Sequence, residues 1–344
     1  MFKALPDRQL INNFHVVSRK TPKRNVAVMS NKFTRFWHSL REQERPARYF
    51  FARIFVNFPK LFSKFYFLRN GYKVLMSPNS IAASFFVYGD SYLSYDERLL
   101  KYLLGKGRFF VDVGANIGHL SVALGCSSHS SGVAIEANPR TFGVLLRNVK
   151  INELSSKVVC LNYAVGESDT TDVEIQDSFS DDCNSVVSHQ QAAAGLDGLY
   201  TVPHNSTHLV KSRTLDSLSR EHRFPARIRL LKIDVEGYEL FVLKGASELL
   251  KATEILYFEY WDKLTRKYGY DDKELFSILE AYKFKLYLAP ELNEAVSFDN
   301  IILTPLSRSH PLSTLSNIIA VNFGLLKPSL NSELTLQDLD RVFS

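Results

Sequence analysis

The sequence contains few cysteines and no long uninterrupted hydrophobic run. Cys126, Cys160 and Cys183 are its only cysteines, and their number and spacing fit neither a disulfide framework nor a zinc site. No stretch has the roughly 18 consecutive apolar residues that a membrane-spanning helix needs. The first 20 residues lack the apolar centre and cleavage site of a secretory signal. We therefore expect a reduced, cytoplasmic setting.

Positive charge is concentrated in one segment. Residues 1–70 contain 15 Lys and Arg but only 3 Asp and Glu, whereas the rest of the chain carries a net negative charge although the whole chain has +6. We interpret residues 1–70 as a basic, aromatic-rich extension. Residues 33–68 suit a membrane surface or a nucleic acid, although a helix that packs its aromatic side on the main domain explains the pattern better. Attraction of residues 1–65 to an anionic membrane surface stays open.

From Gly71 to Phe323, apolar strands alternate with amphipathic helices. Near-continuous apolar strands of this kind predict a doubly wound α/β fold, with a mostly parallel sheet of the seven-stranded type covered on both faces. A hairpin over residues 72–89 precedes it, and residues 324–344 remain as a C-terminal tail. We expect helices at 95–104, 117–126, 138–154, 238–252 and 271–283, and strands at 108–115, 132–137, 157–166, 227–237, 254–262, 284–290 and 316–323.

Residues 167–210 interrupt this alternation. The segment is rich in polar residues and contains one clear strand pattern, "TDVEIQ", followed by a long irregular stretch. Long connections inside compact domains are usually functional loops or disordered segments. We predict an insertion or lid here that shapes a substrate pocket.

The stretch "FFVDVGANIGHLSVAL", residues 109–124, is an apolar strand, a tight turn and the start of a helix. Gly114 and Gly118 suit a turn that needs positive φ or close approach of the backbone to a ligand. The pattern differs from the G-x-G-x-x-G turn that holds a pyrophosphate, because Asn116 stands at the second glycine position. A cofactor without phosphates fits this turn better.

An acidic residue follows the next predicted strand. Glu136 lies 22 residues beyond Gly114, the spacing at which a carboxylate accepts both hydroxyls of a ribose. The predicted parallel strands would end at Asp112 and Gly114, at Glu136, at Ala164–Gly166, at Asp234 and at Glu259. Ligands of such sheets bind outside the carboxyl ends of the strands, so these residues should face one crevice.

The segment "LLKIDVEGYEL" places charged residues within and just after an apolar strand, which is unusual for a buried strand. Lys232 and Asp234 are two residues apart on a strand, so their side chains leave the same face, and an ion pair accounts for the lysine. Asp234 should point into the crevice, which favours a functional role. Glu236 and Glu239 fall in the first turn of the next helix, where negative charge is stabilised whether or not it has a further function.

The motifs "DVGANIGHLS", "EANP", "TLDSL", "LKIDVEGYELFVLKGA" and "NIIAV" resemble those of the FkbM-type methyltransferases, which use S-adenosylmethionine and have the class I methyltransferase fold. Members mostly act as O-methyltransferases on hydroxyls of sugars, polyketides or other metabolites. The resemblance places Glu136 on the ribose of the cofactor. It places Tyr163 and Ala164 near the adenine, and at the methionine end it places Asp112, Gly114, Asn116 and Gly118.

Methyl transfer to a hydroxyl needs a group that takes the proton of the acceptor. Asp234 and Glu259 are our candidates, with His119 as a weaker one because a histidine near a helix start more often makes local hydrogen bonds. Asp234, Glu236 and Glu259 could also offer oxygen ligands to Mg²⁺, but their spacing does not require a metal, and no metal site is predicted.

Three other functions compete with a small-molecule or glycan O-methyltransferase. The basic extension would suit a nucleic-acid methyltransferase, but the catalytic body is acidic and no "NPPY"-like motif follows the fourth core strand. A binding module that has lost its cofactor is disfavoured by the intact Gly114, Gly118 and Glu136. A nicotinamide dehydrogenase is disfavoured by Asn116. We therefore expect a hydroxylated small molecule or glycan as substrate, and no nucleic acid.

Overall fold

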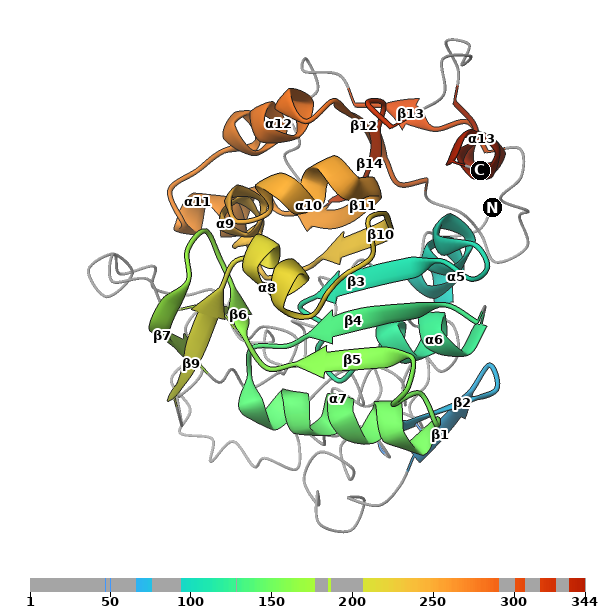
Figure 1. Ribbon diagram of the computed structural model, residues 1–344, viewed down its shortest axis with the longest axis vertical. Coiled ribbons are helices and arrows are strands. Elements are labelled where there is room, and N and C mark those ends of the chain that lie inside the picture. The colour runs from blue at the N-terminus through green and yellow to red at the C-terminus, as the bar shows by residue number, and fades with distance from the viewer. Residues whose placement is uncertain are drawn as a thin grey trace, which may run out of the picture.

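The structure is a computed structural model in which one large sheet lies between two layers of helices (Figure 1). It describes residues 66–75, 94–127, 129–176, 185–186, 207–290, 301–306, 316–325 and 334–343, and the single residues 47 and 50. Most of the basic extension, including residues 1–46, and the predicted strand at 81–89 lie outside the described residues. No helix in the described part is long and apolar enough to cross a membrane.

The large sheet has the predicted parallel core. Its strands run in the order β13 (Thr304–Pro305), β12 (Phe284–Leu288), β14 (Ser316–Asn322), β11 (Thr253–Tyr260), β10 (Ile228–Ile233), β3 (Phe109–Val113), β4 (Ser131–Ile135) and β5 (Val158–Leu161). The five strands from β11 to β5 are parallel, and β14 is antiparallel to both of its neighbours. The seven-stranded arrangement is confirmed, with β13 as an additional short edge strand.

Alternating apolar side chains of the central strands build a core on each face of the sheet. Phe110 and Leu230 pack toward helices α5 (Ser94–Leu104), α6 (His119–Ser127) and α7 (Pro139–Ile151). Val111 and Leu231 pack toward helices α8 (Leu215–Glu221), α9 (Glu239–Lys244), α10 (Ser247–Ala252) and α12 (Asp272–Ala281). Because both faces are covered, these strands have no polar face, which explains their near-continuous apolar sequence.

Helix α7 begins as the sequence predicts and fastens the N-terminal hairpin. Asn138 caps it by accepting hydrogen bonds from the backbone N–H groups of residues 140 and 141, and Pro139 occupies the first position. The amide of Asn148 bonds both the N–H and the C=O of Leu75, and Asn152 does the same for Lys73. Strand β2 (Tyr72–Leu75) therefore lies against α7.

The structure shows an N-terminal hairpin that was not predicted. Strand β2 pairs with β1 (Tyr66–Arg69) through a turn at Asn70 and Gly71, both with positive φ. Strand β1 was not predicted because residues 66–69 share the aromatic composition of the N-terminal extension. The hairpin thus crosses the boundary that we placed between residues 70 and 71.

A second, smaller sheet includes part of the predicted insertion. Its strands run in the order β6 (Ala164–Val165), β9 (Thr207–Arg213), β7 (Thr170–Gln176) and β8 (Ser185–Val186). Figure 1 shows β7 and β9 beyond the carboxyl ends of β3, β4 and β5. Residues 187–206 of the insertion lie outside the described residues.

The single strand predicted at 157–166 is two strands. After β5 the side-chain amide of Asn162 donates to the carbonyls of Glu136 and Ala137, 2.8 and 2.9 Å away, where the chain leaves the large sheet. Ala164 and Val165 then pair with β9. The placement of Ala164–Gly166 at the carboxyl end of the third core strand is therefore wrong, because that strand ends at Leu161.

The predicted helix over 238–252 is also two elements. Helices α9 and α10 are separated at Gly245, which is so close to the carbonyl of Gly166 that a Cβ atom would lie 2.0 Å from its oxygen. Asp216, in the "TLDSL" motif, caps α10 by accepting from the backbone N–H groups of Glu248 and Leu249. The short helix α11 (Asp262–Lys267) was not predicted.

The segment predicted as a C-terminal tail contributes a packed helix, α13 (Leu336–Phe343). Leu336, Leu339 and Phe343 are buried in the core on the α5 side of the sheet. The buried Arg229 guanidinium donates to the carbonyl of Leu339, pairs with Glu254 at 3.2 Å and lies 5.2 Å from the centre of the Phe343 ring. Helix α13 therefore shields a buried ion pair from water.

The packing of α13 predicts a specific loss of stability. Phe343→Ala should lower the free energy of unfolding by about 3 kcal/mol, because it leaves a cavity beside Arg229. Gln337→Ala, at an exposed position of the same helix, should change it by less than about 0.5 kcal/mol. Urea denaturation measures both, and equal effects of the two changes would show that α13 is not part of the folded core.

Candidate active site

The turn after β3 is held by close packing on both sides. Gly114 has φ of 74°, and a Cβ atom there would lie 1.9 Å from the carbonyl oxygen of Asp234. Gly118 has φ of 81°, and a Cβ atom would lie 2.3 Å from Leu145 Cδ1 of helix α7. Both glycines are thus required by the fold itself, because the turn touches the end of β10 and the side of α7.

Asn116 occupies the top of this turn with φ of 53°, a conformation that asparagine tolerates better than most residues. Its side-chain oxygen accepts a hydrogen bond from the backbone N–H of Ile117 at 2.6 Å. Backbone N–H groups at the start of a helix are the donors that hold a pyrophosphate in dinucleotide sites. The side chain of Asn116 already uses one of these donors, which agrees with the prediction of a cofactor without phosphates.

Glu136 directs its carboxylate toward the turn. One carboxylate oxygen accepts from the backbone N–H of Asn116 and the other from that of Asn138, both at 2.8 Å. The side chain is 7% exposed, so these bonds fix its position at the carboxyl end of β4. A carboxylate has about four acceptor sites, so oxygens held in this way can also accept ribose hydroxyls.

A buried lysine connects the turn to the end of β10. Lys232 Nζ lies 3.1 Å from Asp112 Oδ1 and 3.5 Å from Asp234 Oδ2, and it donates to the carbonyl of Gly114 at 3.0 Å. Burial by itself lowers the pKa of Lys232, but the two carboxylates raise it above its ordinary value, so the ammonium group stays charged. The predicted Lys–Asp ion pair is confirmed.

The side chain of Asp112 lies inside the protein. It is 1% exposed, and its second oxygen accepts a hydrogen bond from the Ser121 hydroxyl of α6 at 2.5 Å. In this position Asp112 supports the turn from below. Its assignment to the methionine end of a cofactor site stays a prediction.

Three carboxylates come together at the ends of β10 and β11. Asp234, Glu236 and Glu259 each offer an oxygen atom, and these atoms lie within 4.8 Å of one another. All three side chains are partly exposed. The ends of these two strands therefore carry three neighbouring carboxylates, which can take a proton from a substrate or hold a cation.

Glu239 fixes the loop that carries two of these carboxylates. One oxygen of its buried side chain accepts from the backbone N–H groups of Val235 and Gly237, at 3.1 and 3.2 Å. Tyr270 donates its hydroxyl to the carbonyl of Gly237 at 2.7 Å and lies 3.3 Å from the other carboxylate oxygen of Glu239. Burial, together with the nearby charge of Asp234, raises the pKa of Glu239 to about 7, against the effect of these backbone donors.

His119 belongs to a different buried cluster. Its Nε2 atom lies 3.0 Å from the hydroxyl of Tyr72 and 3.5 Å from a carboxylate oxygen of Glu97, and the side chain is 3% exposed. Glu97 also accepts from Tyr72 at 2.7 Å and pairs with Lys101. The structure thus places His119 between the hairpin and α5 and outside the carboxylate cluster.

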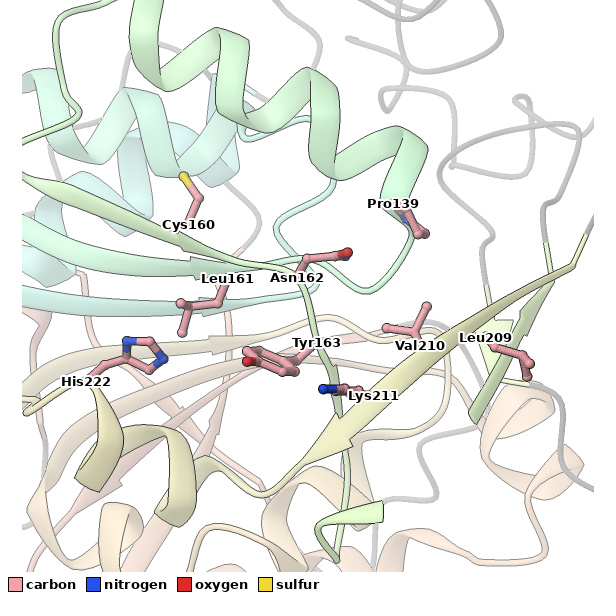
Figure 2. A pocket seen from close by; sticks show the side chains of 9 residues that line it. All are labelled: Pro139, Cys160, Leu161, Asn162, Tyr163, Leu209, Val210, Lys211 and His222. Atoms are coloured by element: carbon pink, nitrogen blue, oxygen red, sulfur yellow. The ribbon is translucent and has the colours of Figure 1, made fainter. Parts of the chain in front are cut away.

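A hollow of about 460 Å³ lies beside the edge strand β5, and Figure 2 shows the side chains that line it. Tyr163 is part of its wall, while Ala164 is buried in the small sheet next to Val210 and Ile175. Asn162, also in the wall, bonds the backbone of Glu136. Tyr163 and Ala164, which the family resemblance places near an adenine, directly follow Asn162 in the chain. The hydrogen bond of Asn162 to the backbone of Glu136 therefore keeps them close to Glu136.

A comparison with known protein families matches the part of the chain that carries these residues. The profile described as "Methyltransferase FkbM domain" matches residues 112–286, from Asp112 in β3 to Leu286 in β12. The chain belongs to the methyltransferase FkbM domain family. The matched segment includes the turn, Glu136, the carboxylate cluster and Glu239. It is shorter at both ends than the range of residues 71–323 expected from the motifs.

One curated relative is the hexuronic acid methyltransferase AglP of Haloferax volcanii, 28% identical over 173 residues. The match covers 50% of this chain and 61% of that relative. A crystal structure of the FkbM methyltransferase of Methylobacillus flagellatus is 15% identical, with a TM-score of 0.35, over 62% of this chain and 43% of that chain. A precorrin-6y C5,15-methyltransferase of Geobacter metallireducens is 12% identical, with a TM-score of 0.34, over 65% and 84% of the two chains.

Some residues that position the site were not found from the sequence. Ser121 and Tyr270 were missed because their contacts come from helix α6 and from the segment after α11, which no local pattern connects to the crevice. Glu239 was noticed only as one of two acidic residues at a helix start. Its position two residues after Gly237 was the available signal, since a carboxylate there can reach the N–H groups of the preceding turn.

The raised pKa of Glu239 predicts pH-dependent stability. The folded protein binds the proton of Glu239 more tightly than the unfolded chain, so its contribution is present below about pH 4.5 and is lost as the pH rises through about 7. We expect the difference in unfolding free energy between wild type and Glu239→Gln to change by up to about 3 kcal/mol across this window. Urea denaturation at a series of pH values measures it. For Gln337→Ala, which changes no ionisable group, the difference should stay flat, and a flat curve for Glu239→Gln as well would contradict the raised pKa.

Proposed function

We propose that this protein transfers the methyl group of S-adenosylmethionine to a hydroxyl group of a sugar or glycan. The observation that carries the proposal is the position of Glu136, whose carboxylate is fixed against the turn of residues 114–118. Family membership supports the methyl donor, because the FkbM domain is a methyltransferase domain. The name of the hexuronic acid methyltransferase supports a sugar acceptor.

Glu136 would bind the ribose of the cofactor, and the backbone around Gly114 and Asn116 would approach its methionine part. Asn162 and Tyr163 would border the adenine. The hydrogen bonds from the backbone N–H groups of Asn116 and Asn138 hold the Glu136 side chain in place, so it needs no rearrangement before the cofactor binds. This lowers the entropic cost of cofactor binding. When bound, the sulfonium supplies an electrophilic methyl group.

The protein then has to deliver a nucleophilic oxygen in line with that methyl group. Asp234 and Glu259 would position the acceptor hydroxyl and accept its proton as the oxygen forms its new bond to carbon, while the sulfur keeps the electrons of the broken bond. Lys232, at 3.5 Å, holds Asp234 in place. Glu239 and Tyr270 keep the backbone of residues 235–237 fixed beneath it.

The same carboxylates suit a second role as ligands. Asp234, Glu236 and Glu259 offer oxygen atoms close enough to share one Mg²⁺ ion, which could bind the acceptor oxygen and lower its pKa. The two roles give different results on metal removal. Turnover that survives EDTA supports the carboxylates as proton acceptors, whereas turnover lost to EDTA and restored by Mg²⁺ supports the metal.

For the basic extension we propose attraction to an anionic membrane surface, because residues 1–70 carry 15 basic and 3 acidic residues. This would bring the enzyme close to membrane-bound glycan acceptors. We expect deletion of residues 1–65 to spare the affinity for S-adenosylhomocysteine and to weaken salt-sensitive binding to anionic vesicles; equal vesicle binding before and after the deletion would contradict the proposal.

Glu136→Ala should abolish cofactor binding, because it removes the acceptor for the ribose and leaves the N–H groups of Asn116 and Asn138 without their partner. Calorimetric titration with S-adenosylhomocysteine measures the loss. Glu153→Ala, at an exposed turn after α7, is the control and should bind like wild type. Unchanged affinity in Glu136→Ala would remove the observation on which the proposed function rests.

Asp234→Asn should keep the affinity for S-adenosylhomocysteine and lower turnover by a factor of about 100 or more, because the amide cannot take a proton. Turnover is measured with radiolabelled S-adenosylmethionine in a screen of hydroxylated acceptors that includes neutral sugars, uronic acids and polyketides. Glu248→Gln, on the exposed face of α10, serves as the control. An Asp234→Asn protein with the wild-type rate would exclude Asp234 as the base.

A further inference from the structure

Trp261 extends the face of strand β11 that carries Glu259. Its backbone is still extended, with φ of −135° and ψ of 109°, and its carbonyl begins helix α11 by accepting from the backbone N–H groups of residues 264 and 265. Side chains alternate along a strand, and Phe258 and Tyr260 are buried in the core on the α9 side of the sheet. Glu259 and Trp261 therefore both leave the sheet on the α5 side, with Trp261 beyond its carboxyl edge.

Polar side chains surround Glu259 on this side of the sheet. Asp234, at the end of β10, offers an oxygen atom within 4.8 Å of one of Glu259. Asn317 of β14 is the register partner of Glu259, and its amide donates to Asp96 of α5 at 3.4 Å. Carboxylate and amide groups can bond the hydroxyls of a sugar, and Trp261 is the aromatic residue next to them along the chain.

Neither the helix start nor the protein core accounts for a tryptophan at this position. The residue before a helix is usually Ser, Thr, Asp or Asn, whose side chain caps it, and the side chain of Trp261 makes no capping hydrogen bond. Trp261 is not among the residues of the described part that pack against the two cores, unlike Tyr268 at the other end of α11. It is partly exposed, and its indole N–H donates no hydrogen bond to a described residue. An aromatic face and a donor are thus available to a ligand.

We propose that the acceptor binds with one face of a pyranose ring stacked on the indole of Trp261, a proposal that rests on the proposed function and adds a residue that selects the acceptor. A pyranose carries C–H bonds on its faces and hydroxyls around its edge. The indole would cover one face, while the hydroxyls reach hydrogen-bond partners. Two residues on a strand are about 7 Å apart, close to the width of such a ring, so a ring on Trp261 would bring an edge hydroxyl to Glu259.

The charge beside Trp261 favours a sugar over a nucleic acid. A nucleobase could also stack on an exposed tryptophan. The strand that carries the base needs basic groups along its phosphates, whereas the carboxylates of Asp234, Glu236 and Glu259 would repel them. The hydroxyls of a sugar ring, by contrast, can donate to these same carboxylates.

Tryptophan fluorescence of the full-length protein tests the assignment directly. Trp37 and Trp261 are the only tryptophans of the chain, so a Trp37→Phe protein reports Trp261 alone. The titrants are the methyl pyranosides of glucose, galactose and mannose and of the corresponding uronic acids, with S-adenosylhomocysteine present. At least one should shift the emission to shorter wavelength until it saturates, because the ring displaces water from the indole. Sorbitol, which has similar hydroxyls but no ring, should leave the emission unchanged.

Turnover with radiolabelled S-adenosylmethionine and the sugar that gives this shift provides a second readout. Trp261→Ala should raise the KM for that sugar by about tenfold or more, because the stacking is lost. Trp261→Phe keeps an aromatic ring and should restore most of the affinity. Both variants should bind S-adenosylhomocysteine like wild type, which shows that they are folded. Trp37→Phe is the matched control and should have the wild-type KM.

The opposite results overturn the assignment. No shift with any of these pyranosides, or the same shift with sorbitol, excludes a sugar ring on Trp261, and a shift with oligothymidylate alone would indicate a nucleic acid. Equal KM values of Trp261→Phe and Trp261→Ala exclude stacking, and a weaker affinity of Trp261→Ala for S-adenosylhomocysteine would assign Trp261 to the cofactor or to the fold. If pyranosides shift the emission but no sugar is methylated, the Trp261 assignment stands and the proposed function fails. If a sugar is methylated and Trp261→Ala keeps its KM, the function stands and the assignment fails.

Discussion

The charge of Lys232 at the centre of the sheet holds the two parts of the candidate site together. Its ammonium group contacts Asp112 and the carbonyl of Gly114 on one side and Asp234 on the other. Removing one partner of such a buried group leaves an uncompensated charge, which costs several kcal/mol. The ion pair therefore fixes the distance between the turn after β3, where a cofactor would bind, and the acidic loop after β10, where an acceptor would react.

Further contacts fasten the turn after β3 and the acidic loop after β10 to neighbouring helices and side chains. Helices α6 and α7 hold the turn through Ser121 and Leu145, and Glu239 with Tyr270 holds the acidic loop. In an in-line methyl transfer, alignment of the reacting atoms can supply a large part of the rate enhancement. A site whose two halves are both fastened to the sheet can supply that alignment.

Local sequence patterns predicted much of the fold and the places in it of several candidate residues, such as Glu136 at the end of β4. Apolar strands, the Asn138–Pro139 helix start and the spacing from Gly114 to Glu136 were sufficient for the parallel sheet and for the position of Glu136. Contacts between distant segments were not predictable. The helix predicted over 238–252 is interrupted at Gly245, where Gly166 packs against it. Helix α13 packs on Arg229, the second residue of β10, which lies more than 100 residues earlier in the chain.

The central claim is that the turn after β3 accepts a nucleoside without phosphates. Calorimetric titration of the wild-type protein with S-adenosylhomocysteine and with NAD tests it most directly. Because Asn116 occupies a backbone donor that a pyrophosphate requires, we expect micromolar binding of S-adenosylhomocysteine and no measurable binding of NAD. Binding of NAD with similar or higher affinity, or binding of neither ligand, would contradict the account.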